Sequence, residues 1–302
     1  MATPTPGSPA PDRGHIPLAG LAIVAAQFSI NIGAALGKGL FPQVGPEGVA
    51  LLRTSIAAAI LLAWVRPWRI PVARAQGFWL LCYGLTLGSM NLLIYWAIQR
   101  IPIGIAVAIE IGGPLAVVLL TSRSRRDFLW FALALAGLLL LVPWPGGTGS
   151  LDPLGIAFAL GAAACWALYI VFGKRASDVG SKAAVAIGMT VACLITVPFG
   201  AARAGAALLD GHVLMVGLAV ALLSSAAPYL LEMMALERLT SRLFGVITSS
   251  APAIAAICGF LVLGERLTGL QWLAVCAMIA ASLGCSLTSG PTLRRATDDA
   301  MG

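Results

Sequence analysis

Ten apolar runs, each long enough to cross a lipid bilayer as an α-helix, follow one another along this chain and decide its fold class. A helix needs about 17 to 25 mostly apolar residues to span about 30 Å of hydrocarbon. The runs show no alternation of apolar and polar residues, so helices rather than barrel strands are expected. They cover residues 16–37, 46–65, 76–98, 102–121, 127–144, 153–173, 183–200, 212–234, 242–263 and 268–287.

The composition agrees with this pattern, because 59% of the residues are hydrophobic and only 10% are charged, with a mean hydropathy of +0.94. Soluble chains carry about 25% charged residues. The sequence therefore predicts an all-α integral membrane protein in which one membrane domain fills the chain. Residues 1–15 and 288–302 are polar, and we expect them to be a disordered amino-terminal tail and a carboxy-terminal tail. A cleaved signal peptide is not expected, since the first run is of full membrane length and lacks a clear cleavage site.

Basic residues predict the orientation of the chain in the membrane. Of the 19 Lys and Arg residues, Arg53 lies inside the second run and 14 flank one side of the membrane. The other side has four, namely Lys38, Arg100, Arg203 and Arg266. Because basic residues concentrate on the cytoplasmic side, both termini are expected in the cytoplasm. The net charge of +7 then needs no nucleic-acid partner to explain it.

A weak internal repeat relates the two halves of the sequence. A shift of 136 residues places Gly37-Lys38 on Gly173-Lys174 and Thr54 on Thr190. A shift of 138 residues adds further matches, which are Ala97 on Ala235, Arg100 on Arg238, Ile109 on Ile247, Pro114 on Pro252 and Asp127 on Glu265. We therefore expect two five-helix repeats, 16–144 and 153–287. Five is an odd number, so the second repeat enters the membrane from the opposite side, which is the architecture of alternating-access carriers.

Residue patterns typical of enzymes are missing from the sequence. It contains no paired carboxylates, no Ser-His-Asp set and no nucleotide-binding loop, and its two His residues, His15 and His212, lie at expected membrane boundaries. The six Cys residues (82, 165, 193, 258, 276 and 285) fall inside the runs without metal-ligand spacing. The sequence thus predicts a transporter rather than an enzyme, with no catalytic residues, cofactor or metal.

Several motifs resemble a known family. The stretches "ALGKGLFPQVGPEGVALLR" and "SSAPAIAAICGFLVLGERLTGLQWLAVCAMIAASLG" are similar to the EamA type of the drug/metabolite transporter superfamily, and the resemblance covers residues 16 to 290. Within it, "LFPQVGPEGVALLR", "GIAVAIEIGGPLAV", "GAAACWALYI" and "PYLLEMMALERL" resemble the threonine/homoserine exporter branch of bacterial inner-membrane exporters most, with aromatic amino-acid exporters close by.

This resemblance implies a function. It implies efflux of neutral amino acids such as threonine and homoserine across the inner membrane, with methionine and aromatic amino acids as a broader range. The alternative is efflux of another small metabolite or a cationic drug. The expected partners are an amino-acid substrate and membrane lipid. The substrate range, the coupling ion and the oligomeric state stay open, with a monomer as the working assumption.

Glu110 is the most informative single residue, because it lies near the middle of the apolar stretch 101–121. A charge at that depth costs about 2.5 to 3.5 kcal/mol, so we expect Glu110 to face protein or water. It could hold the ammonium group of a substrate, carry a proton, line a solvated cavity or pair with Arg53. The pair is geometrically allowed, because both residues lie roughly 10 to 12 Å from the same membrane surface.

Other polar residues fall on inward stripes of the expected helices. Gln27, Asn31 and Lys38 share one face, and Asn91, Tyr95 and Gln99 share another. Tyr229 occupies the repeat position of Asn91, and Trp166 and Tyr169 lie in the interior of the sixth run. The predicted substrate-binding set is Glu110, Asn91, Tyr95, Gln27, Asn31, Trp166, Tyr169 and Tyr229. Hydrogen bonds and aromatic packing between helices are the alternative interpretation of these residues.

Two further groups are predicted to control movement. Arg53, Lys38 and Glu232 are candidates for ion pairs or gates, because they are charged residues inside or at the ends of apolar runs. Pro114 and Pro252 match across the repeats, and a proline inside a helix removes a backbone hydrogen bond and favours a kink. They are therefore candidate hinges, with ordinary structural bends as the alternative.

Overall fold

Each of the ten predicted runs is represented by an α-helix in the computed structural model, which describes residues 16–70, 72–113, 116–117, 125–141, 151–228 and 251–288. The helices are α1 Ile16–Gly39, α2 Phe41–Val65, α3 Arg74–Arg100, α4 Ile103–Glu110, α6 Arg125–Leu141, α7 Pro153–Ala176, α8 Ser181–Ala204, α9 Gly211–Ala221, α12 Ala251–Leu263 and α13 Gly269–Thr288. The all-α fold predicted from the sequence is confirmed.

Five helical segments within the described residues are long and apolar enough to cross a membrane. They are Leu21–Gly39, Phe41–Val65, Arg74–Arg100, Pro153–Gly173 and Lys182–Leu209. Shorter apolar helices stand where four of the other predicted runs are described, namely Phe128–Gly137, Gly211–Ser225, Ala251–Leu263 and Gly269–Ala281. The protein is therefore a multi-pass membrane protein, and the apolar side chains on its outer surface, among them Leu194 and Leu261, face the bilayer.

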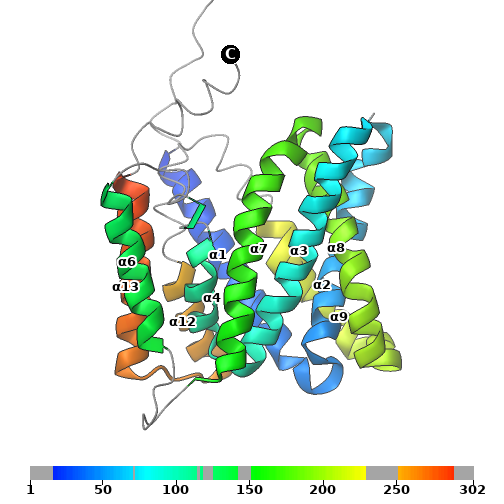
Figure 1. Ribbon diagram of the computed structural model, residues 1–302. Helices are drawn as coiled ribbons and strands as arrows, with labels where there is room; N and C mark the ends of the chain where they lie inside the picture. The colour runs from blue at the N-terminus through cyan, green and yellow to red at the C-terminus, as the bar shows by residue number, and fades with distance from the viewer. Residues whose placement is uncertain are drawn as a thin grey trace, which may run out of the picture.

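The helices stand side by side in one bundle (Figure 1). The start of α1, in dark blue, and the end of α13, in red, lie at the same end of this bundle. The opposite end, where α1 finishes at Lys38 and Gly39, is called the Lys38 end below. The distribution of basic residues predicts that the Lys38 end faces the periplasm.

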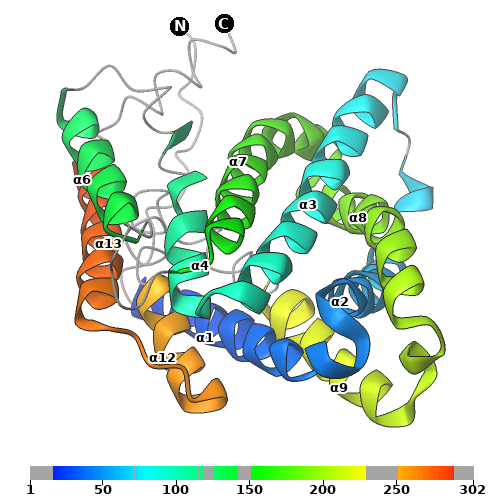
Figure 2. The same ribbon diagram turned by 60° about the horizontal axis from the view of Figure 1, so that its bottom comes forward.

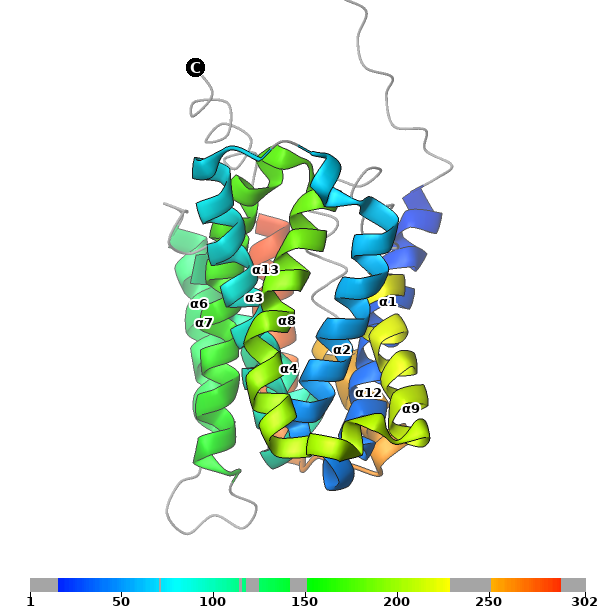
Figure 3. The same ribbon diagram turned by 90° about the vertical axis from the view of Figure 1, so that its right-hand side faces the viewer.

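Helix packing reproduces itself when the two halves of the chain are exchanged. Helix α1 packs on α12 and α7 packs on α4 (Figure 2), while α3 packs on α8 and α9 packs on α2 (Figure 3). The pairs α2–α8, α4–α12 and α6–α13 each map onto themselves, and α6 lies beside α13 at one edge of the bundle (Figure 2). Two inverted repeats related by a two-fold axis produce this pattern. The repeat bounds 16–144 and 153–287 remain a prediction.

Two irregularities interrupt the helices near the interior. In α2, Gly45 has a positive φ of 70° and is followed by Pro46, so the helix kinks there. The predicted run began at residue 46, but one helical turn precedes the kink. In the second half, α9 continues into a π-helical turn, Leu222–Ala226. Such turns are rare and often occur at functional sites.

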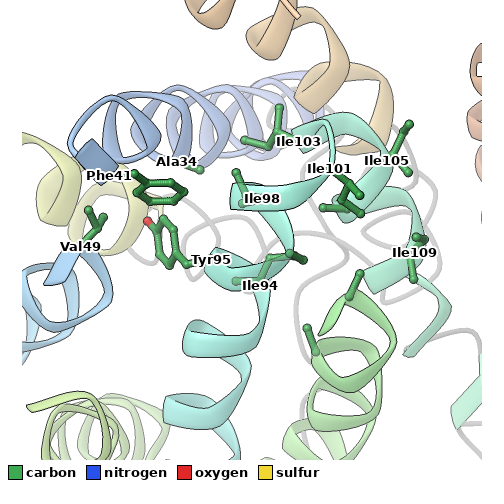
Figure 4. Packing of buried hydrophobic residues seen from close by; sticks show 14 of the residues in the cluster. Ala34, Phe41, Val49, Ile94, Tyr95, Ile98, Ile101, Ile103, Ile105 and Ile109 are labelled. Carbon is green, nitrogen blue, oxygen red and sulfur yellow. The ribbon is translucent and has the colours of Figure 1, made fainter. Parts of the chain in front are cut away.

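The largest buried cluster joins α2, α3 and α4 (Figure 4). Ile103, Ile105 and Ile109 of α4 are almost fully enclosed, and Tyr95 packs edge-to-face on Phe41 with their ring centroids 6.0 Å apart. A Cβ atom at Gly104 would lie only 2.6 Å from Ala256 Cβ, so α4 and α12 pack with little room between their backbones. This close packing places Glu110, the last residue of α4, inside the bundle.

Candidate functional site

Arg53 of α2 forms hydrogen bonds with the second half of the chain. Its Nε donates a hydrogen bond to Ser225 Oγ at 3.2 Å, and its Nη2 donates to the main-chain oxygen of Ser224 at 2.9 Å. The guanidinium carbon also lies 6.0 Å from the centroid of the Tyr95 ring of α3, within the range of a cation–π contact. Arg53 is thus positioned by α3 and by the π-helical turn that follows α9.

The acceptors of Arg53 belong to the π-helical turn, which is itself held against α1. Ser29 Oγ donates to the main-chain oxygen of Leu223 at 2.7 Å. A Cβ atom at Gly33 would lie 2.3 Å from Ser224 Oγ, so only a glycine allows this approach. The sequence analysis missed Ser224 and Ser225; the signal that could have revealed them is two adjacent hydroxyl residues inside an apolar run.

Glu110 is buried, with 9% of its surface exposed, and stands apart from Arg53. Between described residues, the ion pairs within 4.0 Å are Lys38–Glu265 and Arg100–Asp152. The direct pair of Glu110 with Arg53, which the sequence left open, is therefore not formed in this structure. Glu110 is the last residue of α4, and this helix packs on α7.

The three amide residues predicted to face inward are all buried. Asn31 and Asn91 are each 2% exposed, and Gln27 is 7% exposed. Asn31 Nδ2 donates to the main-chain oxygen of Gln27 and Asn91 Nδ2 to that of Leu87, both at 2.8 Å. An amide group has a second N–H and an acceptor oxygen beyond the one donor used here. Their role in substrate binding remains a prediction.

Tyr95 has an unusual environment for a buried phenol. The residue is 1% exposed, and its hydroxyl group has no hydrogen-bond partner among the described residues. Leaving such a group unpaired costs about 1 to 3 kcal/mol, and proteins accept this cost mainly where another molecule completes the bond or a role requires it. Tyr95 is therefore the predicted residue with the clearest spare polar group.

Trp166 and Tyr169 are half-buried in α7. The Tyr83 hydroxyl of α3 donates to the Tyr169 hydroxyl at 3.1 Å, and the two rings lie 4.8 Å apart. For Tyr169 these contacts match the alternative interpretation, aromatic packing between helices. A substrate role for either residue remains a prediction.

Lys38 forms an ion pair with a residue that the sequence analysis did not select. Lys38 Nζ lies 2.5 Å from Glu265 Oε1, and Glu265 Oε2 accepts a hydrogen bond from the main-chain N–H of Ile103 at 2.9 Å. Three segments are thus joined at the Lys38 end. The available signal was the match of Glu265 to Asp127 across the repeats.

Glu47 is a second acidic residue that the sequence analysis missed. Its Oε1 accepts a hydrogen bond from Trp96 Nε1 at 2.7 Å, and its Oε2 is buried without a hydrogen-bond partner among the described residues. The kink at Gly45 and Pro46 places it beside α3. Like Lys38, it lies at the end where α2 begins.

The structure says little about the remaining predicted residues. Tyr229, Glu232 and Pro114 lie outside the described residues. Pro252 is buried at the second position of α12, and its role as a hinge remains a prediction. Among the described residues, no group of three or more His, Cys, Asp or Glu side chains is placed to hold a metal ion.

Comparisons with known proteins give a consistent answer. Residues 153–287 match the EamA-like transporter family. The threonine/homoserine exporter RhtA of Salmonella typhimurium strain LT2 is 51% identical over 268 residues, which cover 89% of this chain and 91% of that protein. The same exporter of Escherichia coli K12 is 51% identical over 88% of this chain and 90% of its own length. A crystal structure with 18% identity and a TM-score of 0.59 covers 91% of this chain and 98% of its own, and shows the same fold.

Proposed function

This chain belongs to the EamA-like transporter family, and on that premise we propose that it exports threonine and homoserine across the bacterial inner membrane by alternating access. As a member of this family it is a transporter and not an enzyme. The relatives with 51% identity are named as threonine/homoserine exporters, which supports the substrate class. The inverted-repeat packing supports the alternating-access mechanism.

The observation that carries the proposal is the separation of two opposite charges inside the bundle. Glu110 is buried and Arg53 is half-buried, and the two form no direct ion pair in this structure. An amino acid carries its own opposite charges, a carboxylate and an ammonium, on neighbouring atoms. The planar guanidinium of Arg53 suits the carboxylate, and Glu110 suits the ammonium. A zwitterion bound between them neutralises both charges.

The side-chain hydroxyl of the substrate also finds a candidate partner. Threonine and homoserine each carry a hydroxyl group, and the enclosed Tyr95 hydroxyl lacks a partner among the described residues. Tyr95 contacts the Arg53 guanidinium through its ring, so the two groups belong to one neighbourhood. A site with an unpaired buried polar group discriminates strongly against ligands that cannot complete the bond. This favours hydroxyl amino acids over methionine and aromatic amino acids.

Counterflow in liposomes tests the proposal directly. Purified protein is reconstituted into liposomes that are loaded with unlabelled threonine. Labelled threonine, homoserine, 2-aminobutyrate, methionine or phenylalanine is then added outside, with protein-free liposomes as the control. We expect exchange of threonine and homoserine, and exchange of 2-aminobutyrate, which lacks the hydroxyl group, at least about tenfold weaker. If folded protein exchanges none of the amino acids, the proposed substrate class is wrong. If all five exchange equally, the broader range applies and Tyr95 does not select the substrate.

A further inference from the structure

Three segments that are distant in sequence converge on one carboxylate at the Lys38 end. Lys38 stands at the end of α1, Glu265 follows α12, and Ile103 begins α4. Glu265 binds Lys38 through Oε1 and the first N–H of α4 through Oε2. The side chains of Lys38 and Glu265 are 23% and 14% exposed, so water reaches the pair only in part.

The local sequence builds this contact. Gly264 ends α12 in the left-handed conformation, with φ at 68°, and its N–H bonds to the main-chain oxygen of Phe260. The N–H of Glu265 then bonds to the main-chain oxygen of Gly259. A Cβ atom at Gly259 would lie 2.6 Å from Glu265 Oε2, so the absence of a side chain there makes room for the carboxylate.

The repeat provides a counterpart for each charged member of the contact. Lys38 matches Lys174 near the end of α7, and Glu265 matches Asp127 in the first turn of α6. The helix contact between α1 and α12 likewise corresponds to the contact between α7 and α4. Because the repeats are inverted, the matched positions belong to the opposite end of the bundle.

We propose that Lys38 and Glu265 form a latch that closes the Lys38 end in one half of the transport cycle, and that Lys174 and Asp127 form the equivalent latch at the opposite end in the other half. Two inverted repeats exchange their conformations when access alternates, so an ion pair present at one end is replaced by its counterpart at the other. A partly exposed ion pair is weak enough to open in every cycle. The inference rests on the proposed function, since it requires alternating access.

Glu265 also couples the latch to the substrate site. It holds the first N–H of α4, and the same short helix ends seven residues later at Glu110. Opening the latch releases the start of α4, so the position of the Glu110 carboxylate changes with the state of the Lys38 end. Glu265 is accordingly a positioning residue and does not contact the substrate itself.

The test follows the reactivity of Cys165, which is half-buried in α7, the helix that packs on α4. In a variant where Cys165 is the sole thiol, a membrane-impermeant thiol reagent is added to intact cells. We expect Glu265→Gln to raise the labelling rate about fivefold, because loss of the carboxylate charge favours opening toward the periplasm. A fivefold change corresponds to about 1 kcal/mol in the free-energy difference between the closed and open states. Lys38→Met should do the same, and exchanging the charges with Lys38→Glu and Glu265→Lys should bring the rate back toward the wild-type value.

A variant of Asp127, at the opposite end, should change the labelling rate of Cys165 in the opposite direction. Asp127→Asn should lower the labelling rate, because it favours opening toward the cytoplasm instead. Asp152→Asn is the matched control, since it breaks a more exposed ion pair at the same end as Glu265 and should leave the rate unchanged. Equal rates for Glu265→Gln, Asp127→Asn and the parent protein would overturn the latch.

Threonine counterflow by the same variants keeps the two proposals apart. Opposite shifts in labelling without any amino-acid exchange would support the latch and reject the substrate assignment. Exchange of threonine by the parent protein with unchanged labelling in every variant would support the transport function and reject the latch.

Discussion

The hydroxyl groups of Thr54 in α2 and Thr196 in α8 lie 2.6 Å apart and share a hydrogen bond between the two halves of the chain. Both residues are fully buried. Each hydroxyl also contacts its own helix, Thr54 at the main-chain oxygen of Ala50 and Thr196 at that of Cys193. The pair lies on a helix contact that maps onto itself when the repeats are exchanged.

The first prediction concerns this pair. Thr54→Val or Thr196→Val should lower the free energy of unfolding by about 0.5 to 1.5 kcal/mol, because each removes the same shared hydrogen bond. The double variant should lose clearly less than the sum of the two, since the bond can be lost only once. Thermal unfolding in detergent, followed through a double-mutant cycle, measures this coupling. Strict additivity would mean that the hydrogen bond contributes nothing to the joining of the halves.

The second prediction concerns orientation and comes from the 14 basic residues on one side against four on the other. A reporter fused after Gly290 should be active in the cytoplasm, and one inserted between α8 and α9 after Leu209 should be active in the periplasm. Activity of the first reporter in the periplasm would reverse the orientation, and with it the assignment of the Lys38 end.

The third prediction concerns Gly259. A methyl group there would meet Glu265 Oε2 at 2.6 Å and Ile103 Cγ2 at 2.7 Å, so Gly259→Ala should displace the carboxylate from its two partners. The labelling rate of Cys165 should then rise as it does for Glu265→Gln. Gly269→Ala is the control, because no heavy atom lies within 4 Å of the added methyl group. A rise in both variants would point to general loosening of the helices rather than to the latch.

The fourth prediction concerns pH at the start of α7. The hydrogen bond from Arg100, at 2.8 Å, holds the pKa of Asp152 below its ordinary value, with a further contribution from the N–H of Leu154. A lowered pKa stabilises the folded protein above the ordinary pKa of an Asp residue, and this contribution disappears as pH falls through the lower, folded-state pKa. Unfolding temperatures of the wild type and Arg100→Gln should therefore converge as pH is lowered from 6 to 3. A constant difference across that range would contradict the role of this hydrogen bond.

The fold followed from the sequence because the length of an apolar run directly limits the structure that can satisfy its backbone in lipid. Each of the ten runs corresponds to a described helix, and the packing of α1 on α12 and of α7 on α4 agrees with the expected repeats. The start of α2 was placed late. Gly45 and Pro46 look like a boundary in sequence, but the structure shows a kink with Phe41 already helical.

The site was less accessible to sequence reasoning, because its partners come from opposite halves of the chain. Arg53 was selected as a charged residue inside an apolar run, but its acceptors in Ser224 and Ser225 depend on a π-helical turn that apolar periodicity does not reveal. Lys38 was selected as a candidate for an ion pair or gate, whereas Glu265 was distinguished only by its match to Asp127, because its contacts with Lys38 and Ile103 exist only in the folded protein. Small hydroxyl residues and loop carboxylates acquire their roles only when distant helices meet.

The most direct measurement for the central claim is the affinity for threonine and two analogues of the wild type, Arg53→Gln and Glu110→Gln. Each affinity is measured as the inhibition of labelled-threonine counterflow by the unlabelled ligand. Threoninol lacks the carboxylate, and 3-hydroxybutyrate lacks the ammonium. We predict that Glu110→Gln weakens the binding of threonine about 10- to 100-fold, because it loses a charged hydrogen bond of about 1.5 to 3 kcal/mol. The binding of 3-hydroxybutyrate should stay unchanged. Arg53→Gln should weaken the binding of threonine and 3-hydroxybutyrate but leave the binding of threoninol unchanged. If each variant weakens all three ligands by the same factor, or none, Arg53 and Glu110 do not hold the two charges of the substrate.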